Sequence, residues 1–268
     1  MFFHFDRRKT KKEKRPTRFL VLRRKWLTLA AAGLVAIAVF AAVNYPAAVS
    51  ASAATRQLPI YCVQRDQKVC SISFDAAWGA DNTQRILDVL KEYGVTCTFF
   101  VVGNWADQYP EQVQAIVESG NELMNHSNAH DHYNSLTADQ IIADVNTCND
   151  KIEALTGIRP TLIRCPFGEY DDHVISAIRS IGMEPIQWDV DSLDWKGISA
   201  SEITKRVTGK VQSGSIVLFH NAGEHTPEAL PDILDYLLAE GYDIVPISKI
   251  LLTCECTIDH TGRQCPVE

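Results

Sequence analysis

Beyond its first 26 residues the chain has little positive charge. Eleven of its 26 lysines and arginines lie in residues 1–26, and the rest of the chain holds 15 basic against 31 acidic side chains, a balance of −16. A surface that binds nucleic acid needs Lys and Arg to neutralise phosphates, so this deficit argues against a nucleic-acid partner. No internal repeat or low-complexity block follows the basic tail, and the remainder suits one domain.

Residues 27–43 contain no charged side chain at all. This run of 17 residues reaches the lower limit for a spanning helix, about 17 to 25 residues, and exceeds the usual signal-peptide core of about 7 to 15. The basic tail at 1–26 predicts that the N-terminus stays in the cytoplasm, so the protein is expected to be exported, with everything after residue 43 outside. Because the small residues at 47–54 resemble a signal-peptidase site, a single-pass membrane anchor and a protein secreted after cleavage both remain open.

Nearly half of the chain, 46%, is apolar, which allows a sizeable core. Its eight cysteines would be able to form disulfides outside the cell. The local candidates are a clamp between Cys62 and Cys70, and a bond within the Cys-containing tail at 253–268. The spacings in that tail fit none of the common structural zinc patterns, so a zinc knuckle is disfavoured.

After a linker at 44–58, short β-type runs alternate with helical segments through a domain at 59–252. This alternation predicts an α/β fold, and the continuous apolar strands indicate a parallel sheet covered on both faces. The expected strands are 69–74, 96–102, 161–165, 184–188, 215–220 and 242–247, and the expected helices are 83–93, 110–119, 137–156, 171–181, 199–211 and 227–240.

Chemically useful side chains follow several of these strands. Asp75 follows the first strand, Arg164 lies near the end of another, and His220 ends the run SIVLFH. In α/β folds ligands bind at the carboxyl ends of the strands, so these residues are expected to share a site. His126 and His130 stand four residues apart in HSNAH, which would place both imidazoles on one face if the segment is helical or nearly so.

Five ordered motifs give the chain a family resemblance. SFDAAWG, HSNAH, RCPFG, DSLDW and LFH, over about residues 69–252, resemble those of the polysaccharide deacetylases of carbohydrate esterase family four, the NodB-like domain. The FDxxWG form of the first motif is similar to the membrane-linked branch found in spore-forming bacteria. The resemblance implies a distorted (β/α) barrel of about seven units and one divalent metal, zinc most often and cobalt or nickel sometimes. It also implies hydrolysis of N-acetyl groups from amino sugars of peptidoglycan or a chitin-like glycan.

The resemblance also implies a role for each motif residue. Asp75 corresponds to the general base, His126 and His130 to metal ligands, and Arg164 to the residue that orients the base. The backbone N–H of Phe167 corresponds to an oxyanion donor.

The last two motifs supply the acid side of the reaction. His220 corresponds to the general acid that protonates the departing amine, with Asp194 as the carboxylate that holds it charged. Trp195 and Leu218 correspond to the lining of the acetyl pocket.

One position departs from the family pattern. The family's first motif carries a second acid, the third metal ligand, where this chain has Ala76. Asp81, in the same loop, is the first choice for a replacement; Asp75 itself, or a neighbour such as His132 or Asn125, are the alternatives. Two hypotheses therefore remain: an active deacetylase, and a catalytically impaired relative that binds cell-wall glycan.

Overall fold

The computed structural model describes residues 33–35 and 56–267. Residues 33–35 are helical and form part of a unit separate from the main body, which begins at Arg56. The predicted basic tail, most of the predicted hydrophobic helix at 27–43 and most of the linker lie outside the described residues. Within the described residues, no helix is both long enough and apolar enough to cross a membrane.

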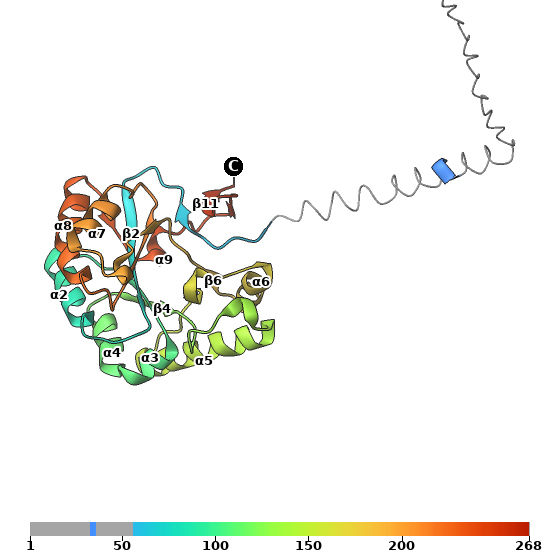
Figure 1. The fold of residues 1–268 in the computed structure, drawn as a ribbon, viewed down its shortest axis with the longest axis horizontal. Coiled ribbons are helices and arrows are strands. Elements are labelled where there is room, and N and C mark those ends of the chain that lie inside the picture. Colours follow the sequence, from blue (N-terminus) through green and yellow to red (C-terminus); the bar gives the residue numbers. More distant parts are fainter. Residues whose placement is uncertain (1–32, 36–55, 268) are drawn as a thin grey trace, which may run out of the picture. The chain divides into compact units, whose positions relative to one another are not determined.

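A parallel sheet forms the centre of the main body (Figure 1). The strand order is β6-β5-β4-β3-β2-β8-β7, with β9 paired to the start of β2, and every neighbouring pair is parallel. The prediction of a distorted barrel of about seven βα units is therefore confirmed. The strands are β2 (Val69–Ala76), β3 (Thr98–Val101), β4 (Glu122–Asn125), β5 (Leu162–Ile163), β6 (Glu184–Pro185), β7 (Val190–Asp191), β8 (Ile216–His220) and β9 (Asp243–Ile244).

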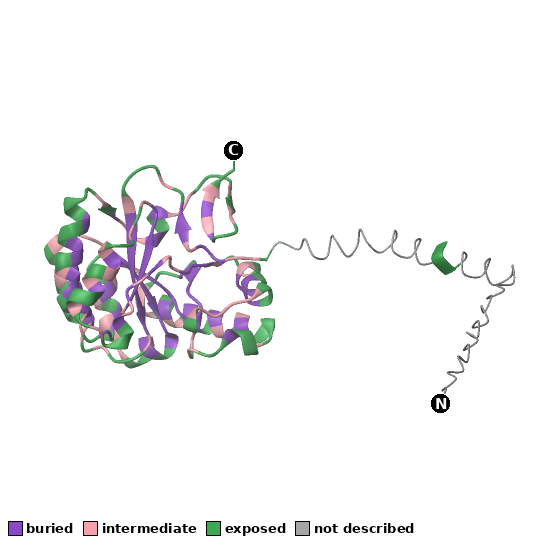
Figure 2. Cartoon of the chain, turned by 45° about the horizontal axis from the view of Figure 1, so that its top comes forward, coloured by how far each residue is buried: buried purple, intermediate pink, exposed green. Residues whose placement is uncertain are grey.

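Helices cover the outside of this sheet, with exposed outer faces and buried inner faces (Figure 2). In α2, for example, Ile86, Leu87 and Leu90 recur at helical spacing and are all buried. The helices are α2 (Thr83–Tyr93), α3 (Gly103–Gln108), α4 (Pro110–Glu118), α5 (Ala138–Thr156), α6 (Asp172–Ser180), α7 (Ala200–Thr208), α8 (Thr226–Ala239) and α9 (Ile247–Ile250). Each of the six predicted helices is present, within three residues at either end.

The core under the central strands is aromatic as well as aliphatic. Phe74 of β2 stacks on Phe99 of β3, with ring centroids 4.8 Å apart, and on Phe219 of β8, at 5.7 Å. All three side chains are fully buried. Because burying a side chain of this size contributes about 1.5 to 3 kcal/mol, this cluster holds β2 and β8, which carry the first and last motifs, in a fixed register together with β3.

The C-terminal residues form a second, smaller sheet. Its strands are β1 (Cys62–Val63), β11 (Arg263–Pro266) and β10 (Cys256–Ile258), in the spatial order β1-β11-β10. All eight cysteines lie in the described part of the chain and none is bonded to another. Both predicted local pairings are therefore wrong: Cys62 belongs to this small sheet and Cys70 to β2 in the main sheet, and the cysteines of the tail at 253–268 are free as well.

Candidate active site

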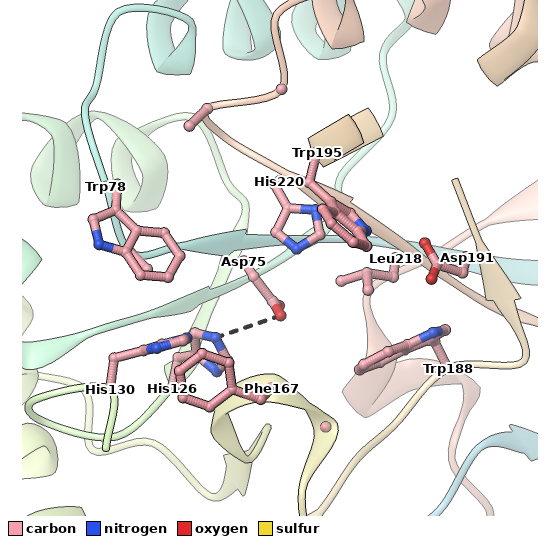
Figure 3. A pocket seen from close by; sticks show the side chains of 14 residues that line it. Asp75, Trp78, His126, His130, Phe167, Trp188, Asp191, Trp195, Leu218 and His220 are labelled. Atoms are coloured by element: carbon pink, nitrogen blue, oxygen red, sulfur yellow. Dashed lines mark ion pairs between the residues drawn. The ribbon is translucent and has the colours of Figure 1, made fainter. Parts of the chain in front are cut away.

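The register of β2 and β8 places the first and last motifs together. Asp75 is the direct partner of His220 across these parallel strands. Both side chains line a cavity of about 650 Å³ at the carboxyl ends of the strands. His126, His130, Phe167, Trp195 and Leu218 line the same cavity (Figure 3), so residues more than 140 positions apart share one pocket.

Asp75 is held from below by a buried arginine. The Arg164 guanidinium is fully buried and donates to Asp75 Oδ1 at 2.8 Å, to Ser73 Oγ at 2.9 Å and to the Gln187 carbonyl at 3.2 Å. Burial, the largest single influence, would raise the pKa of Asp75. The charge and hydrogen bond of Arg164, together with the nearby His126 and His220, outweigh burial, so the pKa of this carboxyl lies below its usual value. Asp75 is therefore an ionised carboxylate that Arg164 orients through Oδ1, while Oδ2 lies on the side of His126.

His220 is paired with a buried carboxylate on its other side. Its Nδ1 lies 2.8 Å from Asp194 Oδ1, and its backbone N–H donates to Asp194 Oδ2 at 2.8 Å. The hydroxyl of Thr226 donates to Oδ2 as well, at 2.6 Å. Gly223 permits this packing, because a Cβ there would lie 2.6 Å from Asp194 Oδ2.

This pairing favours the protonated form of His220. Burial would lower the pKa of His220, but the hydrogen bond and negative charge of Asp194 raise it above its usual value. A histidine whose protonated form is stabilised in this way and whose ring faces a pocket is suited to general acid catalysis.

His126 and His130 meet without a helix. The HSNAH segment is a loop in which Ser127 (φ 71°) and His130 (φ 60°) both adopt left-handed backbone conformations. The helical placement considered for this segment is therefore wrong. The loop nevertheless brings the two imidazole rings together, with their centroids 5.0 Å apart.

The hydrogen bonding of His126 suits a metal ligand. Its Nδ1 lies 2.8 Å from the backbone carbonyl of Arg164, which can only accept, so Nδ1 carries the proton and Nε2 carries the lone pair. That Nε2 faces Asp75 Oδ2 at 3.5 Å. A histidine that binds a metal typically donates its other N–H to a carbonyl in this way. The lone pairs of His126 Nε2 and Asp75 Oδ2 face each other, and a cation between them would stabilise that arrangement.

His130 completes the pair of nitrogen donors. Burial lowers the pKa of His130 to about 4, so its imidazole is neutral at pH 7 and able to bind a metal. The donor set of two neutral imidazoles beside a carboxylate fits a divalent metal chemically. Within the described residues, however, no group of three or more His, Cys, Asp or Glu side chains is arranged to hold one.

The four candidates for a third ligand lie in different surroundings. Asp81 is exposed and is not among the residues that line the pocket. His132 is exposed too, and its ring stacks on Phe167 while its Nδ1 contacts the Glu169 carboxylate at 3.0 Å. Asn125 is fully buried with both atoms of its amide hydrogen-bonded.

Asp75 is therefore the candidate whose oxygen already lies beside a predicted ligand, His126. Neither alanine that follows it can substitute. Ala76 is fully buried in the hydrophobic core, and Ala77 lines the pocket with a methyl group. The role of Asp81 as third ligand stays a prediction.

The remaining predicted residues form the walls of the pocket. Phe167 sits in a short 3-10 turn with a left-handed backbone (φ 59°, ψ 5°), and its ring contacts His130 edge to face at 4.4 Å. Trp195 and Leu218 lie on the side of His220 (Figure 3). Of the ten residues assigned roles from the sequence, Asp81 and the buried pair Arg164 and Asp194 do not line the cavity, and the others do.

Three further lining residues with large or charged side chains were not assigned roles from the sequence. They are Trp78, Trp188 and Asp191. Trp78 belongs to the first motif and Asp191 to DSLDW, so their places in these motifs could have suggested that they line the pocket. Trp188 ends the segment EPIQW, where nothing in the sequence distinguishes a pocket tryptophan from a core one.

Comparison with known proteins identifies the family. The family model described as polysaccharide deacetylase matches residues 63–186. The peptidoglycan-N-acetylmuramic acid deacetylase PdaC of Bacillus subtilis is 34% identical over 70% of this chain, and the chain spans only 40% of its length. A peptidoglycan-N-acetylglucosamine deacetylase of Bacillus cereus is 30% identical, over 68% of each protein.

A solved structure adds a contrasting relative. A CE4 family pseudoenzyme from Bacillus anthracis is 32% identical with a TM-score of 0.69, covering 72% of this chain and 68% of the other. A mutant of that pseudoenzyme with restored enzymatic activity matches equally well, at 33% identity and a TM-score of 0.69, covering 72% of this chain and 70% of the other. Family and fold agree with the five motifs and with the pocket they build, and the chain therefore belongs to the polysaccharide deacetylases, carrying the NodB-like domain of the CE4 family.

Proposed function

We propose that the protein hydrolyses N-acetyl groups from amino sugars of peptidoglycan or a related glycan, with the help of a divalent metal. One observation carries this proposal: Asp75 and His220 are direct neighbours across β2 and β8, and each is backed by a buried residue of opposite charge. An ionised carboxylate and a protonated imidazole on one pocket are the base and acid that amide hydrolysis requires.

Asp75 is the base in this mechanism. Oδ1 is engaged by Arg164, so Oδ2 is the atom that takes the proton from the attacking water. Because the pKa of Asp75 is lowered, its carboxylate is fully ionised and ready to act at neutral pH.

His220 is the acid. It gives its proton to the amine nitrogen as the bond to the acetyl carbon breaks, and Asp194 stabilises the imidazolium before that transfer. An unprotonated amine is a very poor leaving group, so the reaction depends on this proton.

The walls of the pocket position the acetyl group. Trp195 and Leu218 offer apolar surface to its methyl group, and the backbone N–H of Phe167 is assigned to the oxyanion that develops on the carbonyl oxygen. His126 and His130 would hold the metal, zinc first and cobalt or nickel as alternatives. When bound, a divalent metal polarises the carbonyl and lowers the pKa of the attacking water.

The location of the protein belongs to the same proposal. The basic tail and the uncharged run at 27–43 support export, with the catalytic body outside the cell, either anchored by that run or released by cleavage. Relatives named as peptidoglycan deacetylases support a cell-wall substrate.

A second candidate function is supported by two observations. The chain has Ala76 where its family carries a second acid, and it is similar to a CE4 pseudoenzyme. Both favour an impaired relative that binds cell-wall glycan without hydrolysing it. The preserved pairs Asp75–Arg164 and His220–Asp194 favour the enzyme, because glycan binding alone does not need an acid and a base.

Release of acetate separates the two candidates. The full chain is incubated with zinc or cobalt and either purified peptidoglycan or an N-acetylglucosamine oligomer, and acetate is measured. The enzyme predicts metal-stimulated release. Binding of either glycan with no acetate above the blank would establish the second candidate in its place.

A further inference from the structure

Trp78 is an exposed aromatic side chain at the rim of the pocket. It lies in the loop after β2, lines the cavity and leaves 61% of its surface exposed. Its ring contacts His130 edge to face, with centroids 4.6 Å apart. A large flat apolar surface exposed at the mouth of a site is typical of a position that a ligand covers.

The loop that carries Trp78 is tied down on both sides. The carbonyl of Gly79 accepts a hydrogen bond from Trp105 Nε1 of α3 at 2.7 Å and one from Asn221 Nδ2, just after β8, at 2.9 Å. Asn82 Nδ2 donates to the Gly223 carbonyl at 2.9 Å. Gly79 itself adopts φ 57°, which a residue with a Cβ rarely takes. The indole is therefore presented from a fixed backbone, which lowers the entropic cost of binding against it.

Trp78 lies on the opposite side of Asp75 from the proposed acetyl pocket. In Figure 3 its indole stands on one side of the carboxylate, and Trp195 and Leu218 stand on the other. A substrate whose acetyl group enters between Trp195 and Leu218 would therefore extend past Asp75 towards Trp78. The cavity of about 650 Å³ includes both ends.

The chemistry of Trp78 suits a sugar ring. A pyranose has a face of C–H groups that packs on an aromatic ring, while its hydroxyls lie around the edge and remain in water. Building on the proposed function, we propose that Trp78 is a stacking subsite for the sugar next to the one that loses its acetyl group. The preferred substrate is then an internal residue of a linked amino-sugar chain, not a single sugar.

Binding to an inactive variant tests this subsite directly. The full chain carrying Asp75→Asn is titrated by NMR with N-acetylglucosamine and with its pentamer. A chelator is present, so that a change at the predicted metal ligand His130, which Trp78 contacts, cannot alter binding through a metal. We expect Trp78→Ala to raise the Kd of the pentamer by about tenfold, as for loss of one stacked ring, and to leave the Kd of the monomer unchanged. Trp78→Phe keeps a flat ring and should restore most of the affinity.

Tyr236→Ala is the matched control, because Tyr236 is an exposed aromatic residue, 44% accessible, on α8 and outside the pocket lining. An unchanged pentamer Kd in Trp78→Ala, an equal loss for monomer and pentamer, or no binding of the pentamer to the parent variant would each overturn the subsite. Failure of the proposed function gives a different result, the absence of acetate release by the chain with Asp75 intact.

Discussion

Arg164 donates a hydrogen bond to Asp75 Oδ1 at 2.8 Å, and both side chains are buried. This contact favours the ionised form of the Asp75 carboxylate and also fixes its orientation. Among the described residues the buried Nε of Arg164 has no hydrogen-bond partner, so holding the guanidinium against Asp75 costs desolvation energy. Such a pair is expected where orientation of a base matters more than stability.

Removal of Arg164 should therefore destabilise the fold. Arg164→Gln leaves Asp75 buried without its counter-charge, and we expect the free energy of unfolding to fall by about 3 to 5 kcal/mol. Denaturant unfolding of the full chain measures this. Arg159→Gln is the control, because Arg159 pairs with Asp150 and Glu153 at the surface and should change stability by about 1 kcal/mol or less. Equal losses for the two variants would contradict this account of Arg164.

The pH dependence of activity should follow His220. Its pKa is raised by Asp194, so kcat/KM is expected to fall as the pH rises through a pKa that lies above the usual value for histidine. Asp194→Asn removes the negative charge, lowers the pKa of His220 and should move this decline to lower pH. Asp150→Asn, at an exposed position on α5, should leave the profile in place. A decline at the same pH in Asp194→Asn would show that His220 is not the titrating acid.

Metal uptake should depend on the two imidazoles of the HSNAH loop. His126→Gln and His130→Gln each remove one nitrogen donor, and we expect zinc affinity to fall at least about tenfold in either variant. Metal content after dialysis against zinc measures the loss. His173→Gln changes a half-exposed histidine on α6 that pairs with Asp171, and it should leave zinc content as in the parent. Zinc content that is unaffected by both loop variants would refute the assignment of these ligands.

Asp81 offers a separate test of the third ligand. Its side chain is exposed and outside the pocket, so with the loop in its observed position Asp81→Ala should bind zinc as tightly as the parent chain. Competition with a zinc indicator dye gives the affinity. A drop of about tenfold would mean that the WGADNT loop rearranges and that Asp81 reaches the metal.

Local sequence signals predicted the main elements well. The boundaries of α2, Thr83 to Tyr93, follow from its apolar spacing and the glycine that ends it, and β2 follows from its continuous apolar run. The helix α3 was missed because its six residues, GNWADQ, begin with glycine and show no apolar periodicity. The small sheet was missed because β1 and β11 pair across about 200 residues, which no local pattern records.

In the site, too, local sequence predicted some features, while others depend on contacts between distant parts of the chain. Strand ends and motif order identified Asp75 and His220, and the parallel register of β2 and β8 then brings them together. The direction of the loop after Asp75 depends on hydrogen bonds from Trp105 and Asn221 to Gly79, which lie far along the chain from it. Those contacts hold the loop that carries Trp78 and Asp81, so neither the exposure of Asp81 nor the position of Trp78 at the pocket could be read from the motif.

The rate of acetate release by the parent chain and by Asp75→Asn tests the central claim most directly. Both proteins are assayed with zinc and the same N-acetylglucosamine oligomer, after unfolding curves show that both are folded. We predict metal-dependent release by the parent and a loss of about 10²-fold or more in Asp75→Asn, since the amide that replaces the carboxylate cannot accept a proton. Equal release by the two proteins would contradict the assignment of Asp75 as the base.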